Sequence, residues 1–467
     1  MLLFIPKNLD FEELIIKNPP TFKKTKFKIE KLLYIIHLII HIPLVNKLYR
    51  DKRFIPINST LLQSKIHNYT EYLDYLVNIL KIVECDNQYI SGKKSKGYKL
   101  KDYYQTEVII YEVMDCVFKK ALSQEKTKNI EVEKKLYHLT KWFNDLSMDF
   151  EEAMKFAKTQ YKIQSKTTDI PNITNSFNYA KMSIYKIFKR DFFMIRDLNV
   201  YRFHSNLTNM PSMLRNALSY NGENLISIDI KNSQPYFSTI LMNPLFWRKE
   251  KNGIKTSDNG TKTSDFFNLG CKSTDFQLII NIYKLKCNNI IPYIMLEEIL
   301  GCILKHDFSY FINLVVTGKL YEFLQEEIKT EHDVVYNDRK GVKAMVFLVL
   351  FSHNNFLGQP EAKPKKLFKN LFPEVYSLFE IIKRKDKTLL PRLLQNIESY
   401  LIVDVIAKRI SEEYPLAPIF TIHDSIATTP QYVDIVEQVM NEELYLKIGQ
   451  KPKLKREYWN INNLKKV

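Results

Sequence analysis

Two carboxylates in β-prone surroundings are the residues of this chain best suited to chemistry. Asp229 lies near the end of an apolar run, residues 225–230, which predicts a buried strand, and turn-prone residues follow at once. Asp424 lies beside His423 between two β-prone segments, which predicts the tip of a hairpin. Two strand-borne carboxylates that converge can hold a pair of divalent metal ions, the usual arrangement for phosphoryl transfer.

A stripe of cationic and aromatic side chains is predicted on a helix between these two segments. Arg339, Lys343, Phe347 and Phe351 recur every four residues, so a helix places them on one face. The two cations could bind a triphosphate, and Phe347 could stack on a base. Aromatic residues at this spacing are also typical of a helix packed in a core, so the stripe alone leaves both interpretations open.

The order of these segments resembles the superfamily that contains family A DNA polymerases and phage-type single-subunit RNA polymerases. The Asp229 strand is similar to motif A, the helix from Arg339 to motif B, and residues 423–425 to motif C. Arg202 belongs to a segment similar to one that precedes motif A in family A. Gln395, on a predicted helix at 394–406, stands where that family has a glutamine that contacts the duplex minor groove.

The resemblance, which covers residues 197–445, implies a two-metal mechanism of nucleotide transfer. Asp229 and Asp424 would bind two Mg²⁺ ions, which activate the primer 3′-hydroxyl and neutralise the leaving pyrophosphate. Arg339 and Lys343 would hold the phosphates of the nucleoside triphosphate, and Lys343 could protonate the pyrophosphate.

The resemblance also implies contacts to the bases and to the nucleic acid. Phe347 and Phe351 would stack against the incoming base and the templating position. The partners would be nucleoside triphosphates and a DNA primer-template, with RNA as a possible primer or template. The residues expected to contact the nucleic acid are Arg202, Gln395 and His423.

Departures from the family pattern leave the choice between deoxyribonucleotides and ribonucleotides open. With Ser233 aligned to the family A serine, Tyr236 replaces a glutamate, and motif C ends in Ser425, as in the RNA polymerases. Phe351, however, lacks the hydroxyl that RNA polymerases use there, and Phe347 matches the DNA polymerases better. We therefore favour a DNA-directed DNA polymerase with Tyr236 as a steric gate; a single-subunit RNA polymerase or primase-like enzyme is the alternative.

Two further classes of function stay open. A non-catalytic initiator with a polymerase-like fold would bind nucleic acid without copying it, and a template-independent transferase would use the same residues. The carboxylate pair together with two cations favours catalysis, because a protein that only binds nucleic acid does not need buried carboxylates.

Composition favours a folded, intracellular protein with a polyanionic partner. The 467 residues are 45% hydrophobic, and 69 Lys and Arg against 52 Asp and Glu give a net charge of +17. Five cysteines without paired spacing indicate neither a disulfide framework nor a zinc site. The isoleucine, asparagine, lysine and tyrosine content is typical of an AT-rich genome, and a short polymerase would suit a phage or mobile element.

The first 190 residues are predicted to form a basic, mostly helical domain with a thumb-like role. A helix at 70–82 and a strand, turn and strand at 82–100 resemble the end of a winged helix-turn-helix, with Lys93 and Lys94 at a tip that would contact phosphates. An ordinary solvated hairpin is the alternative. Asp10 and Glu12 lack the partners of a proofreading exonuclease, so no proofreading is expected.

The apolar stretch 32–44 is too short to span a membrane, so no membrane contact is expected and a buried helix is predicted. Its two histidines, His37 and His41, are expected to be structural. Overall we expect an α+β right-hand polymerase, monomeric, with palm and fingers in residues 191–467. A small antiparallel palm sheet would carry both carboxylates, helical fingers would occupy 240–415, and a loop is expected at 249–264.

Overall fold

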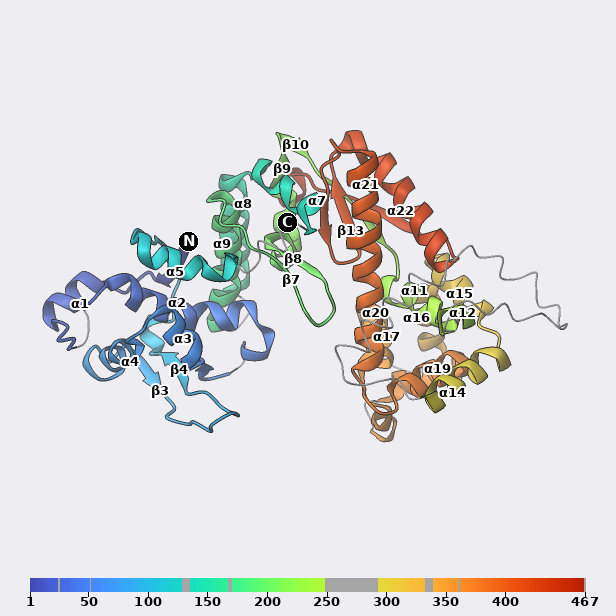
Figure 1. The fold of residues 1–467 in the computed structure, drawn as a ribbon, viewed down its shortest axis with the longest axis horizontal. Helices are drawn as coiled ribbons and strands as arrows, with labels where there is room; N and C mark the ends of the chain where they lie inside the picture. The colour runs from blue at the N-terminus through green and yellow to red at the C-terminus, as the bar shows by residue number, and fades with distance from the viewer. Residues whose placement is uncertain are drawn as a thin grey trace, which may run out of the picture. The chain divides into compact units, whose positions relative to one another are not determined.

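The computed structural model describes residues 1–467 apart from 24–25, 51, 128–134, 167–169, 248–292, 332–338, 360–361 and 466–467. The chain divides into two compact units (Figure 1). The first unit comprises Met1–Ile195, His204–Asn224 and Trp459–Val467, and the second comprises Arg196–Phe203 and Leu225–Tyr458. The predicted boundary at 190 lies near the end of the first long segment, but two later stretches also belong to the first unit. The loop predicted at 249–264 lies outside the described residues.

The first unit contains a helix-and-hairpin region at its N-terminal end. The elements in order are α2 (Ile29–Val45), β2 (Ile55–Pro56), α3 (Ser59–Lys65), α4 (Tyr69–Asp74), a π-helical turn (Tyr75–Ile79), β3 (Val83–Cys85) and β4 (Gly97–Leu100). The strands form an antiparallel sheet in the order β2-β4-β3. A helix followed by a hairpin is therefore present where the sequence resembled a winged helix-turn-helix.

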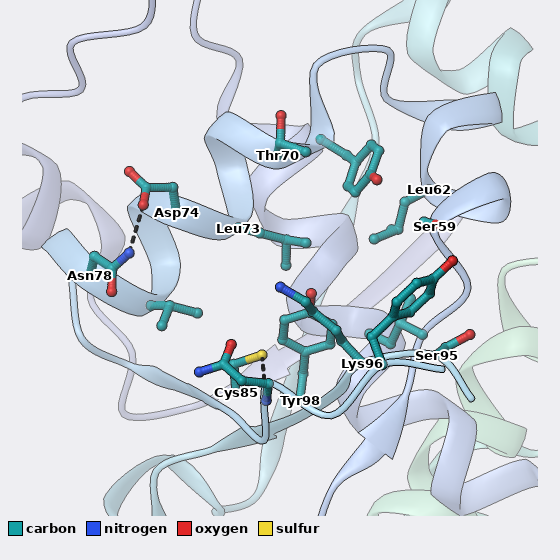
Figure 2. A pocket seen from close by; sticks show the side chains of 15 residues that line it. Ser59, Leu62, Thr70, Leu73, Asp74, Asn78, Cys85, Ser95, Lys96 and Tyr98 are labelled. Carbon is teal, nitrogen blue, oxygen red and sulfur yellow. Dashed lines mark hydrogen bonds between the residues drawn. The ribbon is translucent and has the colours of Figure 1, made fainter. Parts of the chain in front are cut away.

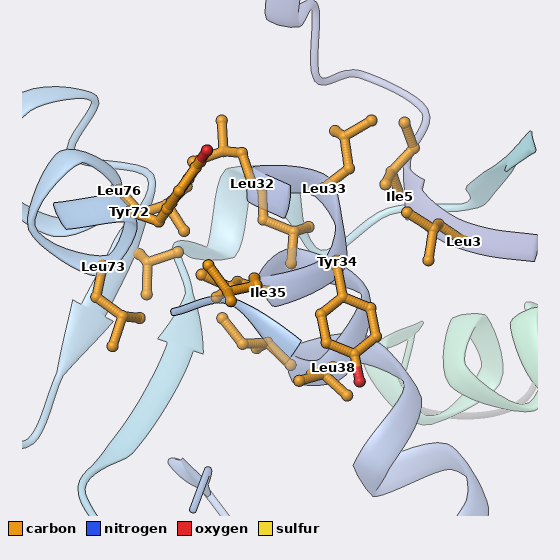
Figure 3. Close-up of a cluster of buried hydrophobic side chains, with 14 of the residues drawn as sticks. Leu3, Ile5, Leu32, Leu33, Tyr34, Ile35, Leu38, Tyr72, Leu73 and Leu76 are labelled. Atoms are coloured by element: carbon orange, nitrogen blue, oxygen red, sulfur yellow. The ribbon is translucent and has the colours of Figure 1, made fainter. Parts of the chain in front are cut away.

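The core of this region forms around α2 (Figure 3). Leu32, Ile35 and Tyr72 are fully buried, so α2 is an interior helix of the first unit. His37 is buried with it, and its Nδ1 accepts a hydrogen bond of 3.1 Å from the amide of Phe4. Burial lowers the pKa of His37 to about 3, with help from the positive charge of Lys186. His37 therefore has a structural contact, as the sequence indicated.

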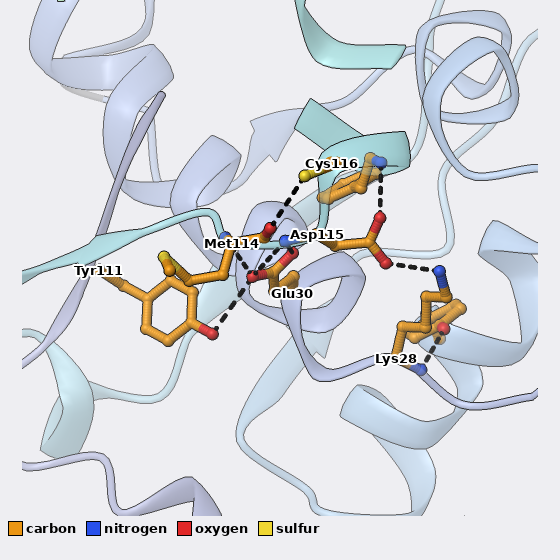
Figure 4. Close-up of polar contacts among 8 residues, drawn as sticks. Lys28, Glu30, Tyr111, Met114, Asp115 and Cys116 are labelled. Atoms are coloured by element: carbon orange, nitrogen blue, oxygen red, sulfur yellow. Dashed lines mark hydrogen bonds and ion pairs between the residues drawn. The ribbon is translucent and has the colours of Figure 1, made fainter. Parts of the chain in front are cut away.

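A buried carboxylate joins α2 to α5 (Cys116–Thr127) (Figure 4). Glu30 accepts hydrogen bonds from the amides of Met114 at 2.6 Å and Asp115 at 3.0 Å. Asp115 in turn accepts from the amide of Phe118 at 2.8 Å and pairs with Lys28 at 2.5 Å. Because both carboxylates use backbone donors, the start of α5 is fixed against α2.

The rest of the first unit consists of short sheets and a helix pair. β1 (Leu2–Pro6) pairs with β5 (Val108–Glu112), and β6 (Leu146–Met148) pairs with β9 (Leu218–Tyr220), which also pairs with β10 (Glu223–Asn224). Helices α8 (Phe150–Gln164) and α9 (Ile170–Phe188) pack together. The smaller helices are α1 (Phe11–Lys17), α7 (Tyr137–Thr140), α10 (Asn206–Asn209) and α23 (Asn462–Lys465).

The second unit is built on a four-stranded antiparallel sheet. Its order is β12 (Phe420–Ile422), β13 (Ser425–Thr428), β11 (Ile226–Ile230) and β14 (Leu454–Tyr458). Alternate residues of β11 are apolar and buried, and α22 (Val433–Ile448) packs against β11 and β13. The predicted strand and hairpin are both present, and the class is α+β as expected.

Helices make up all regular structure described between β11 and β12. They are α11 (Ser233–Ser238), α12 (Pro244–Trp247), α14 (Tyr293–Lys305), α15 (Ser309–Val316), α16 (Leu320–Glu331), α17 (Arg339–Phe351), α18 (Lys363–Leu371), α19 (Pro373–Lys383), α20 (Leu389–Ser399) and α21 (Ala407–Glu413). A π-helical stretch, Tyr400–Ile406, joins α20 to α21. No single helix in the described part of the chain is long and apolar enough to cross a membrane; the bent pair Met295–Lys305 and Ser309–Val316 meets those criteria only when combined.

Two buried lysines donate to carbonyls at the C-terminal end of α17 and just beyond it. Lys383 Nζ donates to the carbonyl of Val349 at 2.5 Å, and Lys365 Nζ donates to the carbonyl of His353 at 2.8 Å. Both side chains are about fully buried, at 1% and 0% exposure. Burial lowers the pKa of Lys383 to about 7, and the charge of Lys365 acts in the same direction. The end of α17 is thus held by amines rather than by solvent.

This burial makes the stability of the protein depend on pH. Between pH 7 and 10.5 the unfolded chain binds the Lys383 proton and the folded chain does not, so the free energy of unfolding should rise with pH. We expect Lys383→Met to reduce that slope by about 1.4 kcal/mol per pH unit. Urea unfolding of both proteins at pH 7.0, 8.5 and 10 measures it, and equal slopes would contradict the expectation.

Candidate active site

Asp229 lies on β11, and Asp424 lies in the turn that joins β12 to β13, the strand next to β11. In the register of β11 with β13, Asp229 stands opposite Ser425, the residue that follows Asp424. His423 begins the hairpin turn with a φ of 55°, a left-handed conformation that lets the chain reverse tightly between β12 and β13. The tertiary fold therefore joins carboxylates that are far apart in sequence, at the same end of the central strands.

The environment of Asp229 disfavours its negative charge. Burial, together with the nearby charge of Asp424, raises the pKa of Asp229 to about 7. Lys343 is close enough to act in the opposite direction. Two carboxylates in such a setting repel each other, and a bound cation relieves both the repulsion and the desolvation. The pair thus has the charge pattern of a divalent metal site.

The predicted stripe on α17 is present where the structure describes it. Phe347 and Phe351 stack with ring centroids 5.2 Å apart and planes inclined by 16°. Lys343 Nζ lies 5.7 Å from the Phe347 ring, and Lys343 is exposed. Arg339 is the first residue of α17, but its side chain lies outside the described residues. One helix face therefore presents a cation toward the carboxylates and two half-buried rings.

Glu398 is a third carboxylate near the pair, and we did not predict it. It is 1% exposed on α20 and accepts two hydrogen bonds of 2.9 Å from Arg202 Nε and Nη2. Gln234 Nε2 donates to the same carboxylate at 2.5 Å. Burial raises the pKa of Glu398 to about 8, and Asp424 adds to the rise, although Arg202 and Gln234 oppose it. The sequence signal that could have found it is an acid in a mostly apolar stretch, since residues 389–406 contain only two acids, Glu398 and Asp404.

The segment that carries Arg202 is fastened to α20 and its π-helical continuation. Arg196 forms a bidentate pair with Asp404, whose Nη1 to Oδ1 distance is 2.7 Å. Ser399 Oγ donates to the carbonyl of Tyr201, a residue in the left-handed region with a φ of 58°. Together with the pair of Arg202 and Glu398, these contacts fix the Arg202 guanidinium beside the carboxylate site.

Tyr236 lies in the interior of the second unit. Helix α11 begins at Ser233, and it turns the tyrosine inward. The side chain is 0% exposed, and its hydroxyl donates to the carbonyl of Gln450 at 2.7 Å. Burial raises the pKa of Tyr236 well above its usual value. A steric gate must meet the ribose of the nucleotide, so this placement counts against the predicted role of Tyr236.

The remaining predicted residues lie as follows. Gln395 is half-buried on α20, three residues before Glu398 and hence on the same helical face. Lys93 and Lys94 are exposed in the hairpin between β3 and β4 of the first unit. Contact of these three residues with nucleic acid stays a prediction.

The residues beside the carboxylates suit a polar ligand. The amide of Asn232 and Oε1 of Gln234 are buried and have no hydrogen-bond partner among the described residues. Buried polar groups of this kind mark positions where a polar ligand can bind. Within the described part of the chain, no group of three or more His, Cys, Asp or Glu side chains gathers as a metal cluster. A metal here would therefore be held by the two aspartates and completed by oxygens of substrate and water, as Mg²⁺ prefers.

The raised pKa of Asp229 predicts that Mg²⁺ binding weakens at acidic pH. Below about pH 7 the carboxyl keeps its proton, which must leave before a metal ion can bind. We expect the Mg²⁺ affinity to fall about tenfold for each pH unit below 7 and to level off above it. Calorimetric titration at pH 5.5, 6.5 and 8.0 measures this; an affinity independent of pH would contradict it. Asp229→Asn is the control and should bind weakly without a pH slope.

Comparisons with known proteins find similar chains among solved structures. No family model matches the chain, and no curated protein matches it. Among solved structures, the chain is similar to the POL domain of Pol1 from M. smegmatis, in a complex with DNA primer-template and dNTP. The TM-score is 0.41 and the identity 11%, over 73% of this chain and 74% of that one. A likeness of this size concerns the path of the chain and carries no residue roles.

Proposed function

We propose that the second unit is a template-directed nucleic-acid polymerase, and that it synthesises DNA in preference to RNA. The observation that carries this proposal is the convergence of Asp229 on β11 with Asp424 in the turn before the adjacent β13, near the cation Lys343 of α17. Metal-binding carboxylates facing a phosphate-binding cation are what nucleotidyl transfer requires. A protein that only binds nucleic acid would gain nothing from two mutually repelling, partly buried carboxylates.

Each residue of the site has a role in this proposal. Asp229 and Asp424 would hold two Mg²⁺ ions, which when bound lower the pKa of the attacking 3′-hydroxyl and neutralise the leaving pyrophosphate. Lys343, with Arg339 at the start of the same helix, would bind the triphosphate and supply a proton to the pyrophosphate. The stacked rings of Phe347 and Phe351 would support the bases, since their faces offer a flat apolar surface.

Arg202 is the residue we assign to the primer-template near the site. Its Nε and one Nη2 hydrogen are committed to Glu398, and the guanidinium has further N–H groups with which to contact nucleic acid. Because Glu398 holds one edge of the guanidinium, Arg202 would contact a duplex without first losing rotamer freedom. The residue acts through binding and not through the reacting atoms.

Primer extension tests the proposal. A labelled primer on a DNA template, with Mg²⁺ and either deoxynucleotides or ribonucleotides, should be extended to the template's end with deoxynucleotides. Faster extension with ribonucleotides would reassign the enzyme to RNA synthesis. Extension of the primer without any template would indicate a template-independent transferase. If the primer is extended on neither DNA nor RNA templates, the protein is a non-catalytic nucleic-acid-binding protein and the proposal is wrong.

A further inference from the structure

A hollow lies between the helix α4 and the hairpin of β3 and β4 in the first unit (Figure 2). Its volume is about 490 Å³, which is within the range of sites for small ligands or single nucleotides. Leu73 of α4 faces it on one side, and Lys96 and Tyr98 of the hairpin line the other. We call this hollow the hairpin groove.

Charge is separated across the hairpin groove. The hairpin carries three exposed lysines, Lys93, Lys94 and Lys96. The opposite wall has no Lys or Arg between residues 66 and 80, and it exposes Asp74, which accepts a hydrogen bond of 2.6 Å from Asn78. A strand in the groove would therefore place its phosphates on the hairpin side, away from Asp74.

The same charge pattern indicates that α4 does not bind in the groove of a duplex. In a helix-turn-helix protein this helix enters the major groove, where phosphates line both sides. Here Asp74 would meet those phosphates without any cation on its own helix. The hairpin lysines can still attract a polyanion, but the helix does not complete a duplex-binding surface.

Aromatic side chains in the groove suit an unpaired base. Tyr69, Tyr89 and Tyr98 line it, and Tyr89 is 60% exposed on the hairpin side. Aromatic rings next to cations are the usual elements of single-strand binding, because rings stack on bases of any sequence and cations hold the phosphates. Duplex DNA hides its base faces inside the stack and could not use these rings.

We propose that the hairpin groove binds single-stranded nucleic acid, with a base against Tyr89 and the adjoining phosphates on Lys96 and Lys93. This proposal adds a binding site to the proposed polymerase. It depends on the proposed function only for the identity of the bound strand as template or primer. The binding itself needs neither metal nor nucleoside triphosphate, so it can be measured without them.

The experiment is fluorescence anisotropy of the full-length protein in EDTA, with a 12-nucleotide DNA strand and a 12-base-pair hairpin duplex as probes. Tyr89→Ala should weaken binding of the single strand about tenfold and change duplex binding less than twofold. Lys96→Ala should weaken single-strand binding and make it less sensitive to salt. Tyr103→Ala is the matched control, since Tyr103 is 72% exposed in the same unit outside the groove.

Photocrosslinking locates the bound strand independently of affinity. A strand with 5-bromouracil should crosslink to the peptide that contains Tyr89. Equal losses of single-strand and duplex binding in Tyr89→Ala, or no loss together with crosslinks elsewhere, would overturn the proposal. A wild-type protein that fails to extend primers but shows these groove effects would overturn the polymerase proposal alone.

Discussion

Asp424→Asn should slow nucleotide incorporation by at least about 10³-fold. The change keeps the size of the side chain and removes one of the two charges that would hold the metal ions, which contribute several kcal/mol to stabilising the transition state. The carboxyl pair would also lose its mutual repulsion, so the variant should fold at least as well as the wild type. Single-turnover incorporation of one deoxynucleotide at saturating Mg²⁺ measures the rate.

Glu457→Gln is the matched control for this loss. Glu457 is exposed on β14, stands opposite Ser227 of the same central strand, and also raises the pKa of Asp229. If the rate of incorporation depended only on the net negative charge of the sheet, both variants would slow it by similar amounts. We expect Glu457→Gln to retain the wild-type rate within about threefold, because a surface charge interacts weakly through water. Comparable losses in the two variants would contradict a metal-binding role for Asp424.

Arg202→Ala should lower the free energy of unfolding by about 3 kcal/mol or more. The change removes the bidentate partner of Glu398, whose carboxylate is 1% exposed and would be left without its charge partner. The loss should be larger at pH 9 than at pH 6, because at pH 6, below its pKa of about 8 in the wild type, Glu398 is neutral with or without Arg202. Urea unfolding at the two pH values measures both effects.

Arg196→Ala offers a control of the same chemistry at a more exposed position. Arg196 pairs in the same bidentate way with Asp404, but the Asp404 side chain is 32% exposed, against 1% for Glu398. Water can solvate Asp404 once its partner is gone, so the loss should be about 1 kcal/mol or less and nearly independent of pH. Equal losses in the two variants would mean that burial of Glu398 does not determine the strength of its pair.

Local patterns in the sequence were sufficient to predict the elements that carry the aspartates. The alternating residues of β11, the hairpin around Asp424 and the periodic stripe of α17 all depend on nearest neighbours along the chain, and the structure has all three. The α+β class followed from the same patterns.

Contacts between distant residues could not be predicted in this way. Arg202 and Glu398 are 196 positions apart in the sequence. Only the tertiary packing of α20 against elements next to the sheet brings them together. The orientation of Tyr236 depended on where α11 begins. The strand ends at Ile230, as the apolar pattern indicated, and Asn232, in the left-handed region with a φ of 55°, turns the next residues into the helix.

The discontinuity of the first unit has a consequence for the order in which the protein can fold. Trp459 is 1% exposed within that unit, and Asn216 Oδ1 accepts hydrogen bonds from the amide of Asn460 at 3.1 Å and from Asn463 Nδ2 at 2.9 Å. A ribosome releases these residues only after the whole second unit has been synthesised. The N-terminal segment must therefore wait, with part of its interior uncovered, until the second unit has been synthesised. A fragment that ends at residue 195 would keep that surface exposed permanently.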